Sequence, residues 1–188
     1  VVLVVARRMT FPSNNLNRAI QLAELPDEGT VLLDAGSTTR RLAERLPPGR
    51  ELTVVTNSLP IAALVSGRPG ITPLLIGGRV RPRTQAAVGG WALRILEEVY
   101  VDAAFIATNG VSVERGLTTP DTSEAEAKRR MVRSARRVVL LTDHTKVGDD
   151  RFARFADLAD VDCLVTDSGL DPRLADELGA AGPRVVLA

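Results

Sequence analysis

The sequence comprises 188 residues, enough for one domain of ordinary size with a substantial hydrophobic core. Its 24 basic residues nearly balance 23 acidic ones, so the net charge of +1 creates no global attraction to nucleic acid or membrane. Aromatic residues make up only 3% of the chain, which argues against base-stacking surfaces. No apolar run approaches membrane-spanning length, and the single cysteine, Cys163, predicts a buried core thiol. These features favour a cytoplasmic protein without an internal disulfide.

The chain begins on Val1 rather than methionine, from which we expect that an upstream segment is missing. Residues 1–13 follow no clear pattern and are interpreted as a linker or the remnant of an adjoining unit. Over 13–24, apolar residues fall on one face of a predicted helix: Leu16, Ala19, Ile20 and Ala23. We therefore assign residues 14–188 to one domain.

Seven apolar runs, many of them rich in β-branched residues, predict strands at 31–33, 52–55, 74–76, 103–107, 138–141, 163–165 and 185–187. Helical apolar spacing lies between most of them, at 38–46, 58–66, 87–99, 122–136 and 172–180. The runs are continuous rather than alternating, which is typical of strands covered on both faces. The sequence therefore predicts a three-layer α/β domain with a mainly parallel sheet flanked by helices.

The turn after the first predicted strand reads Asp-Ala-Gly-Ser-Thr-Thr over residues 34–39 and leads into a helix. Gly36 lets the backbone approach a ligand, while the unpaired N–H groups and the dipole of the helix N-terminus attract an anion. The pattern predicts an anion-binding turn. An ordinary helix cap formed by Ser37 or Thr38 is the structural alternative.

Small, polar or glycine residues follow six predicted strands, at 34–39, 56–58, 77–78, 108–110, 143–146 and 166–168. Turn chemistry alone would enrich such residues at both ends of the sheet. Since ligands bind outside the carboxyl ends of strands in open α/β sheets, the one-sided pattern predicts a small-molecule site.

Several residues in these turns have competing interpretations. Ser58 followed by Pro60 predicts a helix cap, whereas Asn57 is expected to be freer to bind hydroxyl groups. Gly77 and Gly78 could form a bare turn or allow close approach of the backbone to a ligand. His144 is the only histidine, which excludes a metal site with several histidine ligands. His144 itself is more simply interpreted as a turn residue.

The chain contains only two lysines, Lys128 and Lys146. Glu124 lies four residues before Lys128, which predicts an ion pair on the surface of a helix. The spacing of Ser123 and Glu126 predicts a capping box at the start of that helix. Lys146 ends the turn after the fifth strand, where an ammonium group suits a phosphate oxygen or a hydroxyl.

Seven motifs, in their order and spacing over residues 14–168, resemble the C-terminal sensor domain of DeoR-type transcriptional repressors. They are Asp-Ala-Gly-Ser-Thr-Thr at 34–39, Val-Thr-Asn-Ser at 55–58, Gly-Gly at 77–78, Asp-Ala-Ala-Phe at 102–105, Gly-Leu-Thr-Thr-Pro at 116–120, Glu-Ala-Glu-Ala-Lys at 124–128 and Asp-His-Thr-Lys at 143–146. The resemblance implies a fold shared with ribose-5-phosphate isomerase. It also implies an upstream helix-turn-helix domain that binds operator DNA.

The same resemblance implies that the effector is a phosphorylated sugar or a related metabolite, with no cofactor or metal. By position, the phosphate would be held by Gly36, Ser37, Thr38 and Thr39. The rest of the pocket would be lined by Asp34, Asn57, Gly77, Gly78, Asn109, Glu124, Lys128 and Lys146. Repressors that read palindromic operators need paired DNA-binding units, so a homo-oligomer, either a dimer or a tetramer, is implied as well.

A sugar-phosphate isomerase or deaminase on the same fold is the alternative function. Isomerisation needs a positioned base beside the substrate carbonyl and a group that stabilises the oxyanion. In the isomerase pattern the turn after the fourth strand carries acids, whereas here residues 108–110 read Thr-Asn-Gly. Glu124 or Asp143 could substitute, but nothing in the sequence requires it. The sequence therefore favours a sensor without catalysis.

Overall fold

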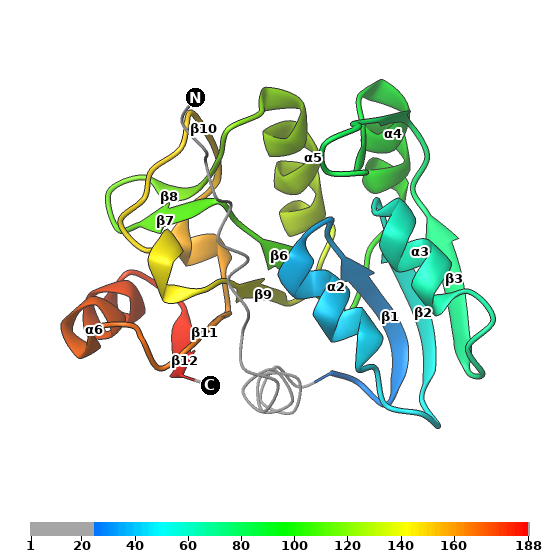
Figure 1. Cartoon of the computed structure of the whole chain (residues 1–188), viewed down its shortest axis with the longest axis horizontal. Coiled ribbons are helices and arrows are strands. Elements are labelled where there is room, and N and C mark those ends of the chain that lie inside the picture. Colours follow the sequence, from blue (N-terminus) through cyan, green and yellow to red (C-terminus); the bar gives the residue numbers. More distant parts are fainter. Residues whose placement is uncertain (1–24, 188) are drawn as a thin grey trace, which may run out of the picture.

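A seven-stranded parallel sheet organises residues 25–187, the part of the chain that this computed structural model describes (Figure 1). Its spatial order is β12-β11-β9-β6-β1-β2-β3. The strands are β1 (Glu28–Leu33), β2 (Glu51–Thr56), β3 (Ile71–Leu75), β6 (Ala103–Ala107), β9 (Val138–Leu141), β11 (Cys163–Thr166) and β12 (Arg184–Leu187). Six of the seven apolar runs named from the sequence lie wholly in these strands, and the run at 74–76 overlaps the end of β3, with Ile76 just beyond it. The helix predicted over 13–24 and the segment 1–13 lie outside the described residues.

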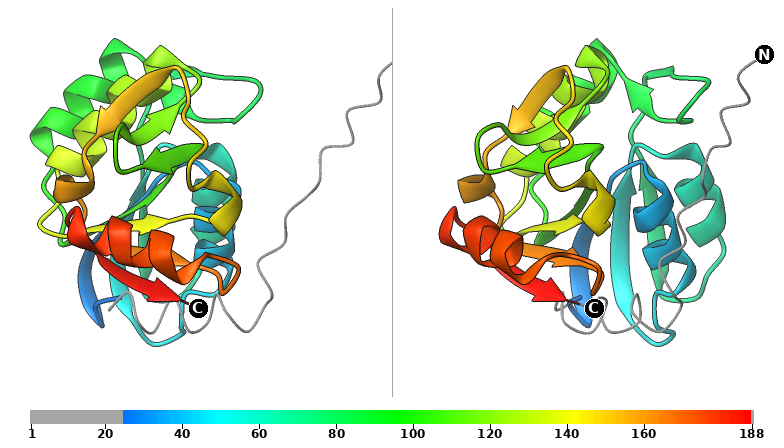
Figure 2. Two further views of the ribbon diagram at one scale, coloured as in Figure 1. Left: turned by 90° about the vertical axis from the view of Figure 1, so that its left-hand side faces the viewer. Right: turned by 60° about the vertical axis from the view of Figure 1, so that its left-hand side comes forward.

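Helices cover both faces of the sheet (Figure 2). They are α2 (Ser37–Glu44), α3 (Leu59–Val65), α4 (Gly90–Glu98), α5 (Thr122–Arg133) and α6 (Pro172–Ala180). One hydrophobic cluster joins α2 and α3 to one face of the sheet, and a second joins α4, α5 and α6 to the other face. Neighbouring residues of β1 divide between the two clusters, since Val31 and Leu33 enter the first and Leu32 the second. The predicted three-layer α/β architecture is confirmed.

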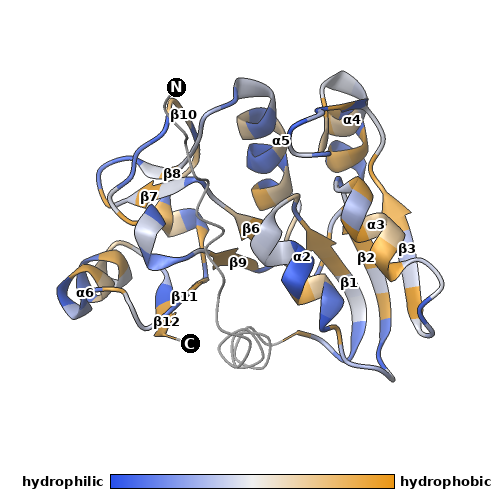
Figure 3. Ribbon diagram, viewed as in Figure 1, coloured by the Kyte–Doolittle hydropathy of each residue, from blue (hydrophilic) through white to orange (hydrophobic). Residues whose placement is uncertain are grey.

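The apolar character of the strands explains this arrangement, because each central strand is buried on both faces. Figure 3 shows β6 and β9 as hydrophobic, whereas α2 is mainly polar and α5 carries both polar and hydrophobic residues. Cys163 on β11 is fully buried, as expected of a core thiol. Within residues 25–187, no helix has both the length and the apolar character that crossing a membrane requires.

Two small sheets were not predicted from the sequence. One pairs β4 (Arg79–Val80) with β5 (Ala87–Val88), and the other contains β7 (Gly110–Ser112), β8 (Gly116–Thr119) and β10 (Ala153–Ala156). The helix predicted over 87–99 therefore begins only at Gly90, because residues 87–88 pair as a strand. Two-residue strands are too short to show a periodic pattern, which is why the sequence did not reveal this hairpin.

The predicted helix caps have mixed outcomes. The Ser58 hydroxyl caps α3 by accepting from the N–H of Ile61 at 3.4 Å, as expected. The capping box predicted for Ser123 and Glu126 is wrong. Helix α5 begins at Thr122, two residues before the start that a Ser123 cap would require, and Asp121 caps it by accepting from the N–H of Glu124 at 3.0 Å. An aspartate at the cap position outcompetes the serine two residues later.

Gly110 permits a close approach between β7 and the loop that precedes β10. A Cβ atom at Gly110 would lie 1.6 Å from the carbonyl oxygen of Asp149. We expect Gly110→Ala to lower the free energy of unfolding by about 1–3 kcal/mol, because overpacking forces the backbone apart. Urea denaturation measures this loss. Gly77→Ala is the matched control, because a Cβ there has no atom within 4 Å; equal effects of the two substitutions would contradict the packing argument.

Candidate functional site

The site lies at the carboxyl edge of the sheet, where the strand order reverses. From β1 the chain continues to β2 and β3 on one side, whereas β6, β9, β11 and β12 lie on the other side. Strands β1 and β6 are neighbours at this reversal, and open α/β sheets bind ligands at such a switch point. Asp34 follows β1, and Ala107 ends β6.

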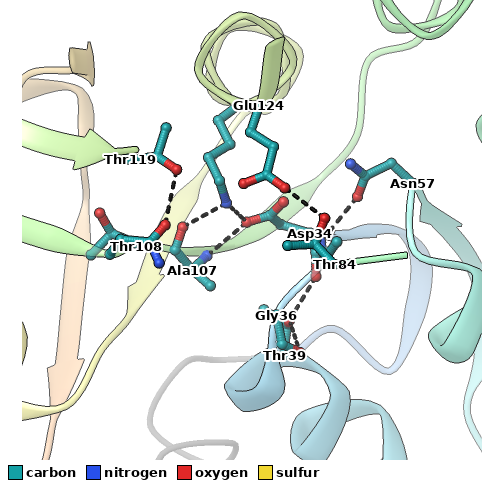
Figure 4. Close-up of polar contacts among 12 residues, drawn as sticks. Asp34, Gly36, Thr39, Asn57, Thr84, Ala107, Thr108, Thr119 and Glu124 are labelled. Carbon is teal, nitrogen blue, oxygen red and sulfur yellow. Dashed lines mark hydrogen bonds and ion pairs between the residues drawn. The ribbon is translucent and has the colours of Figure 1, made fainter. Parts of the chain in front are cut away.

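A buried ion pair between Asp34 and Lys128 occupies the switch point (Figure 4). The two residues are only 1% and 4% exposed. The Lys128 ammonium donates to Oδ2 of Asp34 and, at 2.9 Å, to the carbonyl of Ala107, while the Ala107 N–H donates to the same Oδ2 at 3.1 Å. The ring centroid of Phe155 lies 5.7 Å from Nζ, within the range of a cation–π contact.

The predicted surface pair between Glu124 and Lys128 is wrong, because both side chains point inward from α5 and take different partners. Burial raises the pKa of the Asp34 carboxyl, and the nearby Glu124 carboxylate adds to this, although the Lys128 ammonium opposes it. The i, i+4 spacing does place Glu124 and Lys128 on one face of α5, but that face covers the site.

Glu124 is held by the hairpin formed by β4 and β5. Its Oε1 atom accepts hydrogen bonds from the Arg81 guanidinium and, at 2.6 Å, from the Thr84 hydroxyl. The second nitrogen of Arg81 lies 3.0 Å from Asp121. Sequence reasoning did not identify Arg81 or Thr84, since nothing in the pattern shows that a turn some 40 residues away returns to the start of α5.

Asn57 is not the free group that the sequence suggested. Its Oδ1 accepts from the N–H of Ala35 at 3.0 Å, and its Nδ2 donates to the carbonyl of Ala87 at 3.2 Å. Its main-chain carbonyl also accepts from the N–H of Ala87 at 2.8 Å. The buried Asn57 side chain therefore joins the turn after β1 to the hairpin.

The turn after β1 leaves the N-terminus of α2 without a side-chain cap. The cap residue is Gly36, in an extended conformation, and the first turn contains no acidic residue. Ser37 is exposed and Thr38 half-buried, and both are already helical, so the alternative that they cap the helix is wrong. The N–H groups at the start of α2 and the helix dipole are thus available to an anion.

Thr39 and Gly36 shape this turn. The Thr39 hydroxyl donates to the carbonyls of Asp34, at 2.6 Å, and Gly36, at 3.0 Å, so this fully buried side chain points into the turn. A Cβ atom on Gly36 would lie 2.8 Å from the Cβ of Ala107. The glycine is therefore needed for the approach of the turn to β6.

The remaining predicted residues lie farther from the ion pair or have protein partners. A Cβ atom on Gly78 would lie 2.7 Å from the carbonyl of Val88, so the close approach there is to β5, while Gly77 is exposed. The Asn109 amide oxygen accepts from the Thr119 hydroxyl at 2.9 Å. Lys146 is half-buried at the end of the short 3-10 helix His144–Lys146, which follows β9.

His144 has a structural role in that short helix. Its Nδ1 lies 2.6 Å from Asp167, whose carboxylate also accepts from the His144 main-chain N–H at 2.9 Å. This agrees with its interpretation as a turn residue. Over residues 25–187, no group of three or more His, Cys, Asp or Glu side chains is arranged to hold a metal ion.

The buried pair gives a direct test of how the site is held together. We expect Lys128→Met to lower the free energy of unfolding by about 3–5 kcal/mol, because it leaves the Asp34 carboxylate buried without its cation. The double variant Asp34→Asn/Lys128→Met should be considerably more stable than Lys128→Met alone, because no buried charge remains. Urea denaturation of the single and double variants measures the coupling. Strictly additive losses would show that the two side chains do not depend on each other.

Known proteins resemble this chain in sequence and in fold. The HTH-type transcriptional regulator GlpR of Haloferax volcanii is 39% identical over 170 residues, which cover 90% of this chain and 66% of GlpR. The chain thus spans slightly less than two thirds of that relative. The solved structure of a probable sor operon regulator from Shigella flexneri has a TM-score of 0.57 at 12% identity and covers 91% of this chain and 90% of that chain. This likeness supports the predicted fold.

Ribose 5-phosphate isomerase A from Neisseria gonorrhoeae has a TM-score of 0.47 at 15% identity over 72% of this chain and 52% of that chain, a likeness too distant to support a conclusion. The family model of the DeoR C terminal sensor domain matches residues 18–168, most of the chain. That family and the similar relative are regulatory, in agreement with the expected sensor rather than an enzyme. This chain belongs to the DeoR C-terminal sensor domain family.

Proposed function

We propose that this chain is the effector-binding part of a longer cytoplasmic transcriptional repressor, in which an upstream helix-turn-helix domain binds operator DNA. Family membership and the similarity to an HTH-type regulator support this proposal. A homo-oligomer, either a dimer or a tetramer, is part of it, because palindromic operators are read by paired DNA-binding units.

The effector in this proposal is a phosphorylated sugar or a related metabolite, with its phosphate at the start of α2. The observation that carries the proposal is the uncapped N-terminus of α2 at the switch point of the sheet. Main-chain N–H groups are the proposed phosphate ligands because the nearby cations are engaged elsewhere. Lys128 and Arg81 are already paired with carboxylates. Helix N–H groups would therefore supply most of the attraction for the anion.

The carboxylates of Asp34 and Glu124 suit the hydroxyl groups of a sugar. Each uses one oxygen for its protein partners, Oδ2 in Asp34 and Oε1 in Glu124. Across residues 25–187, no donor is hydrogen-bonded to the other oxygen of either carboxylate. An ionised carboxylate only accepts hydrogen bonds, so these oxygens complement donors such as hydroxyls. An anion-binding turn beside two acceptors fits a molecule with both a phosphate and hydroxyls.

The phosphate assignment predicts different behaviour for charged and neutral ligands. Phosphorylated sugars should raise the melting temperature, with a stabilisation of ~2.7 kcal/mol at a hundredfold excess over the dissociation constant. Their neutral parent sugars should bind far more weakly. Ser37→Asp should abolish phosphate binding through charge repulsion, yet stabilise the free protein slightly, by about 0.5 kcal/mol, through the α2 dipole. A thermal-shift screen of both proteins checks these opposite effects.

Ser37→Asn is the matched control, because it has nearly the same size as Ser37→Asp without the charge. It should retain binding, since main-chain N–H groups rather than the Ser37 hydroxyl hold the phosphate. Equal shifts with a sugar and its phosphate would remove the phosphate assignment from this turn.

A sensor must bind its effector differently in two states to change affinity for DNA. Lys146 is suited to produce a difference in effector binding between the two states. The residue lies between the core strand β9 and the polar segment 147–151, so its ammonium group is attached near the end of a fixed strand. We expect Lys146→Ala to weaken effector binding by ~1.5–3 kcal/mol through loss of a charged hydrogen bond, while the fold stays intact. Calorimetric titration measures this, with Lys146→Arg as the charge-preserving control.

In the full-length regulator, Lys146→Ala should still bind operator DNA but resist release by the metabolite. Unchanged effector affinity in the Lys146→Ala domain would show that this lysine is outside the site.

A further inference from the structure

We propose that Arg81 and Thr84 are positioning residues of the ligand site, which hold one oxygen of Glu124 so that the other accepts a ligand hydroxyl. This inference rests on the proposed function, because it assigns the part of the site that recognises the sugar. It adds the hairpin of β4 and β5 to a site otherwise built from the sheet edge, α2 and α5.

The contacts to Glu124 converge on one atom. The Arg81 guanidinium and the Thr84 hydroxyl both donate to Oε1, the latter at 2.6 Å. Two donors on the same oxygen fix the plane and direction of the carboxylate. Glu124 is 8% exposed, so its side chain has little room to take another rotamer.

The carboxylate held in this way faces the rest of the site. Figure 4 shows the Glu124 carboxylate beside Asp34, with a dashed line joining it to Thr84. The Arg81 charge offsets the Glu124 charge in the same way that Lys128 offsets Asp34. The hairpin thus places a positive charge on one oxygen of this second carboxylate and leaves its other oxygen facing the site.

Main-chain contacts hold the hairpin in place. The N–H and carbonyl of Ala87 bond to Asn57, and the Gln85 carbonyl accepts from the N–H of Leu59 at 3.1 Å. Gln85 itself has a φ of 54°, an unfavourable conformation for a residue other than glycine. Its N–H donates to the Arg81 carbonyl at 2.8 Å, which closes the tip of the hairpin. A strained, hydrogen-bonded tip is suited to presenting Arg81 and Thr84 at fixed positions.

Arg81 acts through Glu124 in this arrangement. One guanidinium nitrogen contacts Glu124 and the other contacts Asp121, so the cation is engaged on both sides by α5. Removing Arg81 or Thr84 should therefore affect recognition of hydroxyls and leave phosphate binding by the α2 turn unchanged.

The test uses calorimetric titration with two kinds of probe, inorganic phosphate and the tightest-binding member of a panel of aldose and ketose phosphates. Thr84→Val, a substitution of similar shape at an exposed position, should weaken sugar-phosphate binding about three- to tenfold. Arg81→Gln should weaken it about ten- to a hundredfold. Inorganic phosphate should bind both variants as it binds the wild type. Arg83→Gln, at an exposed arginine of the same hairpin, is the control and should change neither affinity.

A double-mutant cycle shows whether Arg81 and Thr84 influence sugar-phosphate affinity through Glu124. In the Glu124→Gln background, Thr84→Val and Arg81→Gln should cause little further loss of sugar-phosphate affinity, because their target is already altered. Undiminished losses in that background, or no loss in the single variants, would overturn the inference. If Arg81→Gln fails to fold, the Thr84→Val cycle decides alone. Failure of the wild type to bind any panel member would instead overturn the proposed function, and this inference with it.

Discussion

The buried ion pair between Asp34 and Lys128 is the interaction on which the site depends. It joins the end of β1, the end of β6 and the middle of α5, because both partners also bond to the main chain of Ala107. Removing two charges from water costs several kcal/mol per ion, and the attraction offsets this only with additional hydrogen bonds. Apolar residues of similar volume would serve stability as well or better. The pair is therefore best understood as a device that fixes three elements at the switch point, with both of its contacts to Asp34 on one carboxylate oxygen.

In the proposed site, this pair also leaves Lys128 with no charge to spare for an anion. Arg81 is neutralised by Glu124 and Asp121 in the same way that Lys128 is neutralised by Asp34. The N-terminus of α2 differs, since Gly36 provides no side-chain cap and Thr39 bonds backwards into the turn. The site thus divides its chemistry between main-chain donors at one end and carboxylate acceptors at the other. Under the proposed function, the anionic group of the effector would meet the first end and its hydroxyls the second.

The sequence predicts the central sheet well because continuous apolar runs have few other stable arrangements. The resemblance to the DeoR family also groups Asp34, Asn57, Glu124 and Lys128, which the structure brings together around the carboxyl ends of β1 and β2. Their partners are less predictable, because Asp34 and Lys128 are 94 residues apart and no local pattern joins them. The local rule instead pairs Lys128 with Glu124 at i, i+4, a pairing that tertiary burial overrides. The hairpin of β4 and β5 could not be predicted for a similar reason. Its two-residue strands are held by contacts with Asn57 and α5, which are distant in the sequence.

Helix α5 connects the two halves of the site. Lys128 reaches the sheet through Asp34 and Ala107, and one turn earlier Glu124 reaches the hairpin through Arg81 and Thr84. The first connection is buried in the core, whereas the tip of the hairpin is exposed and meets α5 through side chains. In the proposed site, a ligand that contacts both carboxylates would therefore bridge the edge of the sheet and the hairpin through α5.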